Sequence, residues 1–215
     1  DVDSTALGFS GGFPGDFITQ TLEDSNIQSD FVQVDEDTRI NVKLKSGQET
    51  EINAPGPKVT HAQFEQLLSQ IRRTTKDDIV IVAGSVPNSI PSDAYAQIAQ
   101  ITEKTGAQLV VDAEKDLVET VLPYRPLFIK PNKDELEVMF NTTVKSDEDV
   151  IKYGKEILKK GAQSVIISLG GDGAIYVDQH QSIKAVNPQG HVVNTVGSGD
   201  STVAGMVCLL YTSPS

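Results

Sequence analysis

Asp77-Asp78-Ile79-Val80-Ile81-Val82-Ala83-Gly84 contains an unbroken apolar run, bounded by two carboxylates on one side and by glycine on the other. A continuous run is typical of a strand buried on both faces, as in a parallel sheet, whereas a half-exposed strand alternates apolar and polar residues. Similar short runs recur along the chain: Leu109-Val110-Val111, Leu127-Phe128-Ile129 and Val165-Ile166-Ile167. The sequence therefore predicts a mostly parallel sheet.

Helical patterns lie between these strands. Residues 64–71 carry apolar side chains at the spacing of one helix face, behind a capping box of Thr60 and Gln63. Residues 146–161 begin with a serine N-cap and end with Lys159-Lys160-Gly161, which is typical of a helix C-terminus. Alternating strands and helices imply right-handed crossovers, so we expect an α/β fold with three layers, α/β/α.

The segment 30–53 has a different pattern. Residues 31–34, 39–44 and 49–52 alternate apolar with polar, and residues 45–48 form a turn signal between the last two stretches. We expect an antiparallel patch there, a small β lid beside the main sheet, and a further hairpin over residues 174–186. The expected domains are a core over 1–29 and 54–215 and the lid over 30–53.

Composition excludes several classes of protein. The chain has 215 residues, with 18 Lys and Arg against 30 Asp and Glu, a formal net charge of −12. This acidity argues against nucleic-acid binding and against docking on an anionic membrane. Cys208 is the single cysteine, so neither an internal disulfide nor a cysteine-based zinc site is expected. With no apolar run of membrane-spanning length and no signal peptide, the cytoplasm is the expected location.

The strongest functional signal is the stretch 194–205, Asn-Thr-Val-Gly-Ser-Gly-Asp-Ser-Thr-Val-Ala-Gly. A glycine loop that opens a helix points several N–H groups and the positive end of the helix dipole at one spot, which suits a transferring phosphate. Asp200, in the first helical turn, could accept the proton of an attacking hydroxyl. By itself, Gly-Ser-Gly-Asp is more often a turn with an aspartate N-cap; the length of the pattern and the neighbouring loops favour the functional interpretation.

Three more loops follow buried strands, where open α/β sheets bind ligands. The glycine-rich loop 168–173 would let the backbone approach a nucleotide, or would be a loose hairpin connection. Asn132 and Glu135 could orient waters around Mg²⁺, although Asn-x-x-Glu is also a capping box. Gly84-Ser85 could hold an anionic or polyhydroxylated substrate together with Arg39, which by itself would be a solvated strand residue.

These features together resemble those of the PfkB carbohydrate kinases, which have the ribokinase-like fold. The resemblance runs from about Thr5 to Val207, and residues 194–207 carry the C-terminal signature of the family. It implies an ATP-dependent phosphotransferase with an alcohol group as acceptor, working with Mg²⁺. It also implies that Asp200 is the catalytic base and that Gly197, Ser198 and Gly199 form the anion hole.

The same resemblance implies the other ligand contacts. The ATP site would comprise Ser168, Gly170, Gly171, Asp172, Gly173, Gly199 and Asp200. Asn132 and Glu135 would be the pair linked to Mg²⁺. The sugar phosphate would contact Arg39, Gly84 and Ser85.

Within the family, residues 38–43, 54–57 and 196–201 most resemble the kinases of ketohexose phosphates. This implies phosphorylation of D-fructose 1-phosphate to fructose 1,6-bisphosphate. Two alternatives stay open: phosphorylation of tagatose 6-phosphate to tagatose 1,6-bisphosphate, and a non-catalytic module that binds a sugar phosphate or nucleotide. An intact Asp200 argues against the module. The lid of the family often packs on a second lid, which implies a homodimer.

The chain departs from the resemblance at both ends. Family members carry an earlier segment with a first strand, an acidic sugar-binding residue and a Gly-Gly-Lys-Gly loop, and residues 208–215 do not resemble the usual continuation of the last helix. We therefore expect a piece truncated at both ends, with exposed sheet edges. Missing sugar contacts would weaken the positioning on which phosphoryl transfer depends, so we expect this piece by itself to be unstable or inactive.

Overall fold

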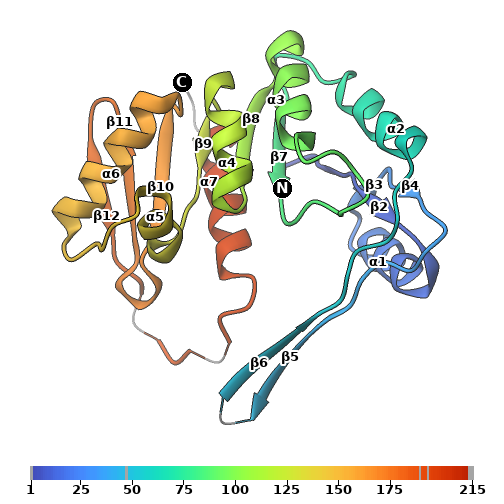
Figure 1. Cartoon of the computed structure of the whole chain (residues 1–215), viewed down its shortest axis with the longest axis horizontal. Helices are drawn as coiled ribbons and strands as arrows, with labels where there is room; N and C mark the ends of the chain where they lie inside the picture. Colours follow the sequence, from blue (N-terminus) through green and yellow to red (C-terminus); the bar gives the residue numbers. More distant parts are fainter. Residues whose placement is uncertain (1, 47, 189, 193, 213–215) are drawn as a thin grey trace. The chain divides into compact units, whose positions relative to one another are not determined.

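The computed structural model describes residues 2–46, 48–188, 190–192 and 194–212 (Figure 1). Internal contacts divide the chain into two compact units. Unit 1 consists of Asp1–Ile71 and Val86–Ala94, and unit 2 of Arg72–Ser85 and Tyr95–Ser215. The expected division into a core and a lid over 30–53 stays a prediction. Among the described residues, no helix has both the length and the apolar character needed to cross a membrane.

Unit 2 is built on a six-stranded sheet with the strand order β12-β11-β10-β9-β8-β7 (Figure 1). The strands are β7 (Ile79–Ala83), β8 (Gln108–Asp112), β9 (Phe128–Ile129), β10 (Ser164–Ser168), β11 (Ala174–Asp178) and β12 (Ser182–Ala185). Strands β7 to β10 run parallel, and β11 and β12 follow as an antiparallel hairpin. The four apolar runs are thus the four parallel strands, which confirms the prediction of a mostly parallel sheet and of the hairpin.

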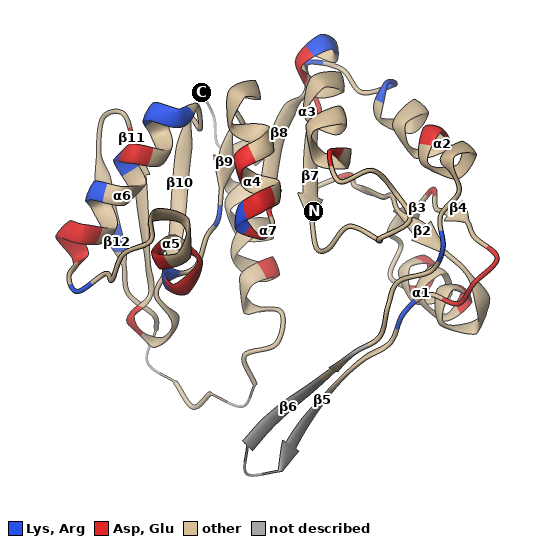
Figure 2. Ribbon diagram, in the orientation of Figure 1, with Lys and Arg blue, Asp and Glu red and all other residues tan. Residues whose placement is uncertain are grey.

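Five helices accompany this sheet in the part of the chain that the structure describes, and α6 begins and ends at the signals read from the sequence. They are α3 (Ala94–Thr105), α4 (Lys115–Val121), α5 (Lys133–Phe140), α6 (Asp147–Lys160) and α7 (Ser198–Thr212). Ser146 caps α6 by accepting the N–H of Asp149, and Gly161 ends it with φ 136°. Acidic residues occupy the first turn of α6 and lysines its last turn, at opposite ends in Figure 2, where each charge complements the helix dipole.

The sheet is the middle one of three layers. Consecutive residues of a strand point to opposite faces, so Ile166 and Ile167 of β10 mark the two sides. Ile166 packs in a cluster with Val203 of α7. A Cβ at Gly154 of α6 would lie 3.3 Å from Ile167 Cδ1. Since α7 and α6 therefore cover opposite faces, the predicted α/β/α arrangement is confirmed.

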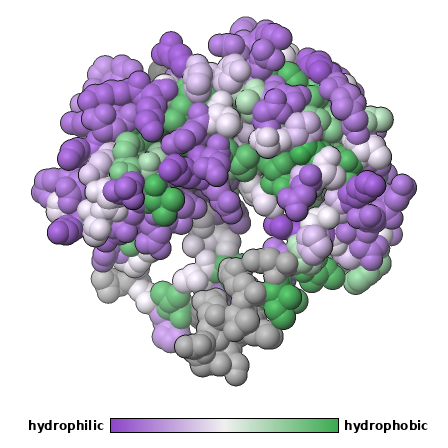
Figure 3. All heavy atoms as spheres, viewed as in Figure 1, coloured by the Kyte–Doolittle hydropathy of each residue, from purple (hydrophilic) through white to green (hydrophobic). Residues whose placement is uncertain are grey.

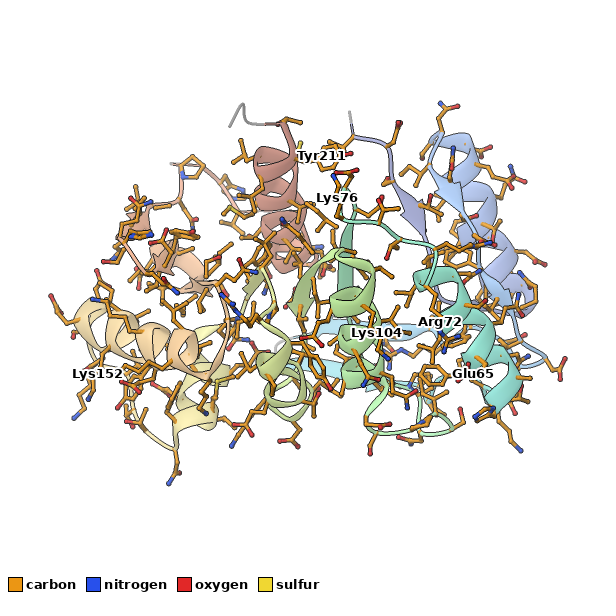
Figure 4. The ribbon with its side chains drawn as sticks, turned by 90° about the horizontal axis from the view of Figure 1, so that it is seen from above. Glu65, Arg72, Lys76, Lys104, Lys152 and Tyr211 are labelled. Atoms are coloured by element: carbon orange, nitrogen blue, oxygen red, sulfur yellow. The ribbon has the colours of Figure 1, made fainter. Side chains whose placement is uncertain are left out.

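The outer side of α6 is polar, as its amphipathic sequence requires. Lys152 extends from α6 away from the strands in Figure 4. Figure 3 likewise shows mostly hydrophilic side chains over the end of unit 2 that carries α5 and α6. The apolar residues Val150 and Ile157 are buried beneath this layer. The helix thus faces the sheet with one stripe and solvent with the other.

Unit 1 contains short strands and two helices. They are β1 (Thr5–Ala6), β2 (Phe9–Ser10), α1 (Gly12–Asp24), β3 (Gln28–Ser29), β4 (Val32–Gln33), β5 (Asn41–Ser46), β6 (Gln48–Asn53) and α2 (His61–Ile71). The capping box before α2 is present, with Thr60 N–H donating to Gln63 Oε1 at 2.8 Å and Gln63 N–H to Thr60 Oγ1 at 3.3 Å. Strands β5 and β6 form the expected antiparallel hairpin. Gly47, in its expected turn, lies outside the described residues.

One expectation for the segment 30–53 is wrong. Residues 31–34 do not join the antiparallel hairpin; β4 pairs in parallel with β2. Val32 N–H donates to Gly8 O at 2.8 Å and Val34 N–H to Ser10 O at 2.9 Å. Val32 and Val34 are buried in unit 1. Alternating residues can face a core from a parallel strand as well, so the alternation could not distinguish the two pairings.

Candidate functional site

A cavity of about 660 Å³ opens in unit 2 at the carboxyl ends of its parallel strands. It is bounded by the segments that follow β9 and β10, by Asn187 after β12, and by the first turn of α7. Parallel strands end at one edge of a sheet, so loops far apart in sequence meet there. The sequence analysis predicted glycine-rich and carboxylate-bearing loops at these same strand ends.

The cavity brings together six of the predicted site residues. They come from the three segments singled out in the sequence and are Asn132, Ser168, Gly170, Gly173, Ser198 and Gly199. Other predicted residues of the same loops lie within three positions of these in the chain but do not line the cavity: Glu135, Gly171, Asp172, Gly197 and Asp200. Asn187 Nδ2 donates to the carbonyl oxygens of Gly170 and Gly171 at 2.9 and 3.3 Å, which ties this loop to the segment after β12.

The loop before α7 is arranged as an anion site. Gly197 has φ 77°, a left-handed conformation that favours glycine, and Ser201 N–H donates to its carbonyl at 2.8 Å. The N–H groups of Gly199 and Asp200 find no acceptor in the described part of the chain. Unpaired N–H groups at a helix N-terminus favour an anion. The wall of the cavity at Gly199 is therefore suited to a phosphate.

Asp200 stands beside this wall without lining the cavity. Its side chain is exposed, with no hydrogen bond or ion pair among the described residues. Ser198 and Thr202, which line the cavity, share one face of α7. Because each helical residue turns by about 100°, Asp200 projects to another side of α7 than Ser198, adjacent to the unpaired N–H groups. A carboxylate there is available to accept a proton from a group that approaches the phosphate.

The site also contains a buried ion pair, and its lysine was given no role in the site by the sequence patterns. Lys130 follows β9 and Asp112 ends β8, and Lys130 Nζ lies 3.1 Å from Asp112 Oδ1. The side chains are only 8% and 18% exposed. A Cβ at Gly199 would lie 3.3 Å from the same ammonium, so the cation lies beside the unpaired N–H groups of α7. The signal was present in the sequence, since both residues follow apolar runs at neighbouring strand ends.

Asn132 and Glu135 form the capping box that the sequence left as an alternative. Asn132 Oδ1 accepts the N–H of Glu135 at 2.8 Å, and Glu135 Oε2 accepts the N–H of Asn132 at 2.7 Å. This box begins α5 and confirms the structural role. Their role toward Mg²⁺ stays a prediction. Within the described residues there is no cluster of three or more His, Cys, Asp or Glu arranged for a metal.

The residues expected to contact a sugar phosphate belong to different units. Arg39 is an exposed residue of unit 1 that precedes β5, whereas Gly84 and Ser85 follow β7 in unit 2. Gly84 has φ 88°, its N–H donates to Asp112 O at 3.3 Å, and its carbonyl accepts the hydroxyl of Tyr95 at 2.8 Å. Burial, reinforced by the charge of Asp112, raises the pKa of Tyr95 to about 12. The Tyr95 hydroxyl is thus a permanent donor near neutral pH.

The cavity has the parts that nucleotide phosphates require. Lys130 and Lys133 supply positive charge, Gly170 and Gly173 leave the backbone bare, and Gly199 offers an unpaired N–H. Mg²⁺ bound with nucleotides commonly keeps several waters and takes only one or two carboxylates from the protein. Asn132 and Asp134 both line the cavity and carry side-chain oxygens, so the donor set fits a hydrated magnesium ion.

Comparison with known proteins gives a consistent answer. Residues 2–212 match the model of the pfkB family of carbohydrate kinases. A 1-phosphofructokinase of Bacillus subtilis (strain 168) is 42% identical over 206 residues, which are 96% of this chain and 68% of that protein. A D-tagatose-1-phosphate kinase of Bacillus licheniformis is 38% identical over 207 residues, covering 96% of this chain and 68% of that protein.

A solved structure is similar over the whole chain. The crystal structure of a protein of Staphylococcus aureus assigned as a phosphofructokinase is 77% identical, with a TM-score of 0.88. The match covers 100% of this chain and 70% of that one. The chain therefore spans about the same share of its solved and its curated relatives.

Proposed function

Because the chain belongs to the pfkB family of carbohydrate kinases, phosphotransferases that act on an alcohol group, we propose that it transfers the γ-phosphoryl group of ATP to a ketohexose phosphate. The observation that carries the proposal is the first turn of α7. There the unpaired N–H groups of Gly199 and Asp200, the ammonium of Lys130 and the exposed carboxylate of Asp200 meet beside one cavity. Unit 2 would bind ATP in that cavity, with Ser168 and the glycines of 170–173 against the nucleotide.

The proposed reaction is an in-line displacement. A sugar hydroxyl loses its proton to Asp200 while its oxygen bonds to the γ-phosphorus and the bond to the bridging oxygen of ADP breaks. Such a transition state gains mainly from positioning and from groups that stabilise the charge of the transferred phosphoryl. Gly197, Ser198, Gly199 and Lys130 would supply that stabilisation. Mg²⁺, when bound near Asn132 and Glu135 through water, would neutralise part of the phosphate charge.

The preferred acceptor is D-fructose 1-phosphate, phosphorylated at its C6 hydroxyl. The relative named as a 1-phosphofructokinase supports this choice. The relative named as a D-tagatose-1-phosphate kinase makes tagatose 1-phosphate a second candidate substrate. Both sugars carry phosphate on C1 and offer the C6 hydroxyl. Tagatose 6-phosphate, the alternative from the sequence, would need the reverse orientation. Arg39, Gly84 and Ser85 would contact the phosphate or hydroxyls of the sugar.

Comparison of substrates tests this proposal. The protein would be expressed with any coding sequence that flanks residues 1–215, and ADP formation would be followed with each ketohexose phosphate. We expect the highest kcat/KM for D-fructose 1-phosphate and a lower value for tagatose 1-phosphate. A higher kcat/KM for tagatose 6-phosphate would overturn the substrate assignment. Binding of ATP and sugar phosphate without formation of ADP would instead favour the non-catalytic module.

The lid hairpin is the proposed dimer contact. Val42 of β5 and Ile52 of β6 are cross-strand partners, 42% and 55% exposed, so they form an apolar pair on one face of the hairpin. A second copy of the same face would cover them. We further propose that the enzyme works in the cytoplasm, where ATP is available.

Sedimentation velocity at micromolar concentration tests the dimer. We expect the unmodified protein to sediment as a dimer and the variant Val42→Lys/Ile52→Lys as a monomer, because paired ammonium groups cannot be buried in an apolar contact. The matched control is Ile183→Lys, a similarly exposed apolar residue on β12 of unit 2. An unmodified protein that sediments only as a monomer would contradict the proposal, as would equal dissociation in the control.

A further inference from the structure

Tyr95 is a buried hydroxyl that the proposed chemistry does not use. It lies at the start of α3, its side chain is almost fully buried, and its hydroxyl donates to Gly84 O at 2.8 Å. A tyrosine chosen only to fill the core could be replaced by phenylalanine without leaving a partner unpaired. Here the hydroxyl instead reaches a backbone carbonyl in the segment expected to contact the sugar.

The carbonyl of Gly84 shares a peptide plane with the N–H of Ser85. In a trans peptide the C=O and the next N–H point in opposite directions, so fixing one fixes the other. Ser85 is exposed, and its N–H has no acceptor among the residues that the structure describes. Tyr95 therefore determines the direction in which the exposed and unpaired N–H group of Ser85 points.

The other side of Gly84 is held as well. Gly84 N–H donates to Asp112 O at 3.3 Å, and the Asp112 carboxylate pairs with Lys130, which lies beside Gly199. One continuous set of contacts in unit 2 thus joins Tyr95 to the first turn of α7. Gly84 has φ 88°, a left-handed conformation that favours glycine, and its backbone is hydrogen-bonded on both sides, through its N–H and through its carbonyl.

The position of Tyr95 along the chain makes this contact more important. The chain leaves unit 2 after Ser85 and returns to it at Tyr95, with Val86–Ala94 in unit 1. The hydrogen bond between Tyr95 and Gly84 therefore joins the point of departure to the point of return. Without it, the Gly84–Ser85 peptide would keep no hydrogen bond among the described residues of unit 2, because the contact with Asp112 O is made by the preceding peptide through Gly84 N–H.

We propose that Tyr95 is a positioning residue for the acceptor sugar: its hydroxyl orients the Gly84–Ser85 peptide so that Ser85 N–H donates to the phosphate or a hydroxyl of the sugar. This inference rests on the proposed function. Because burial raises the pKa of Tyr95 to about 12, the hydroxyl stays protonated and keeps donating throughout the range in which a kinase would be assayed.

The variant Tyr95→Phe tests this role, since it removes one oxygen and keeps the ring. Gly84 is an exposed residue, so water can replace the lost donor at its carbonyl and the midpoint of thermal unfolding should move little. We expect KM for D-fructose 1-phosphate to rise by about 5- to 10-fold, the equivalent of one ordinary hydrogen bond, while KM for ATP stays unchanged. Equilibrium binding of the sugar phosphate in the absence of ATP should weaken by the same factor.

Tyr153→Phe is the matched control. Its hydroxyl is also hydrogen-bonded inside unit 2, to Thr142 Oγ1 at 3.0 Å, but this bond joins α6 to the loop after α5. The control should leave both KM values unchanged. If the unmodified protein is active and Tyr95→Phe leaves KM for the sugar unchanged, or raises both KM values together, the positioning role is refuted and the proposed function stands. If the unmodified protein forms no ADP with any ketohexose phosphate, the proposed function fails, and the inference fails with it.

Discussion

Asp200→Asn should lower the turnover of ATP in the presence of D-fructose 1-phosphate by roughly 10²- to 10⁴-fold, the range that removal of a general base usually costs. The amide has nearly the shape of the carboxylate but cannot accept the proton of the sugar hydroxyl. Asp200 is exposed and lies in the first turn of α7 without a partner among the described residues, so the substitution should leave the fold intact. The dissociation constant for ATP should change little.

Single-turnover kinetics and a control variant test this prediction. Single-turnover kinetics with saturating ATP and sugar should show the loss in the chemical step rather than in product release. Asp77→Asn makes the same change of charge at an exposed residue paired with Lys76 before β7, and its turnover should equal that of the unmodified protein. A rate for Asp200→Asn within a few-fold of normal would reject the assigned role of this carboxylate.

Lys130→Met should have the largest effect on stability, because it leaves the Asp112 carboxylate without its partner in a mostly buried position. Breaking one side of a buried ion pair typically costs about 3–5 kcal/mol. We expect a clear fall in the urea midpoint of unfolding. Turnover should fall too, since the ammonium beside Gly199 is lost from the proposed anion hole.

A double variant separates these two effects. Lys130→Met/Asp112→Asn removes both charges, so it should recover much of the stability lost in the single variant. Turnover should remain low, because the missing positive charge is not restored. If the double variant recovers stability and activity together, the pair is structural only, and Lys130 has no role in charge stabilisation. An unchanged urea midpoint in the single variant would contradict the inferred burial of the pair.

Local sequence signals predicted the sheet and the helix ends for a simple physical reason. Strands β8, β9 and β10 are buried on both faces, so their sequences are continuously apolar. The expectation of burial on both faces is wrong for β7, which has the same continuous pattern but lies at the end of the strand order, where Ile81 is 45% exposed. Ser146 and Gly161 act on the backbone of their own helix, so the residues that determine the ends of α6 are close in sequence. The wrong expectation for residues 31–34 concerned the strand partner, which alternation does not specify.

The site was predictable in part. Its loops could be found because glycine-rich segments follow apolar runs, and Ser168, Gly170, Gly173, Ser198 and Gly199 do line one cavity. The pair of Lys130 and Asp112 was missed because it links two strand ends through space. The bond from Tyr95 to Gly84 was missed for the same reason, since a tyrosine on the buried side of an amphipathic helix gives no sign of where its hydroxyl points.

Amide chemical shifts measured during binding of a non-hydrolysable ATP analogue test the central claim most directly. In ¹⁵N-labelled protein, we expect the largest downfield proton shifts at the backbone N–H groups of Gly199 and Asp200, because these donors gain a phosphate oxygen as acceptor. Smaller shifts should follow in the loop 168–173, which forms the nucleotide side of the same cavity. Saturable binding that leaves the N–H groups of Gly199 and Asp200 unmoved would contradict the claim that α7 receives the transferring phosphoryl group.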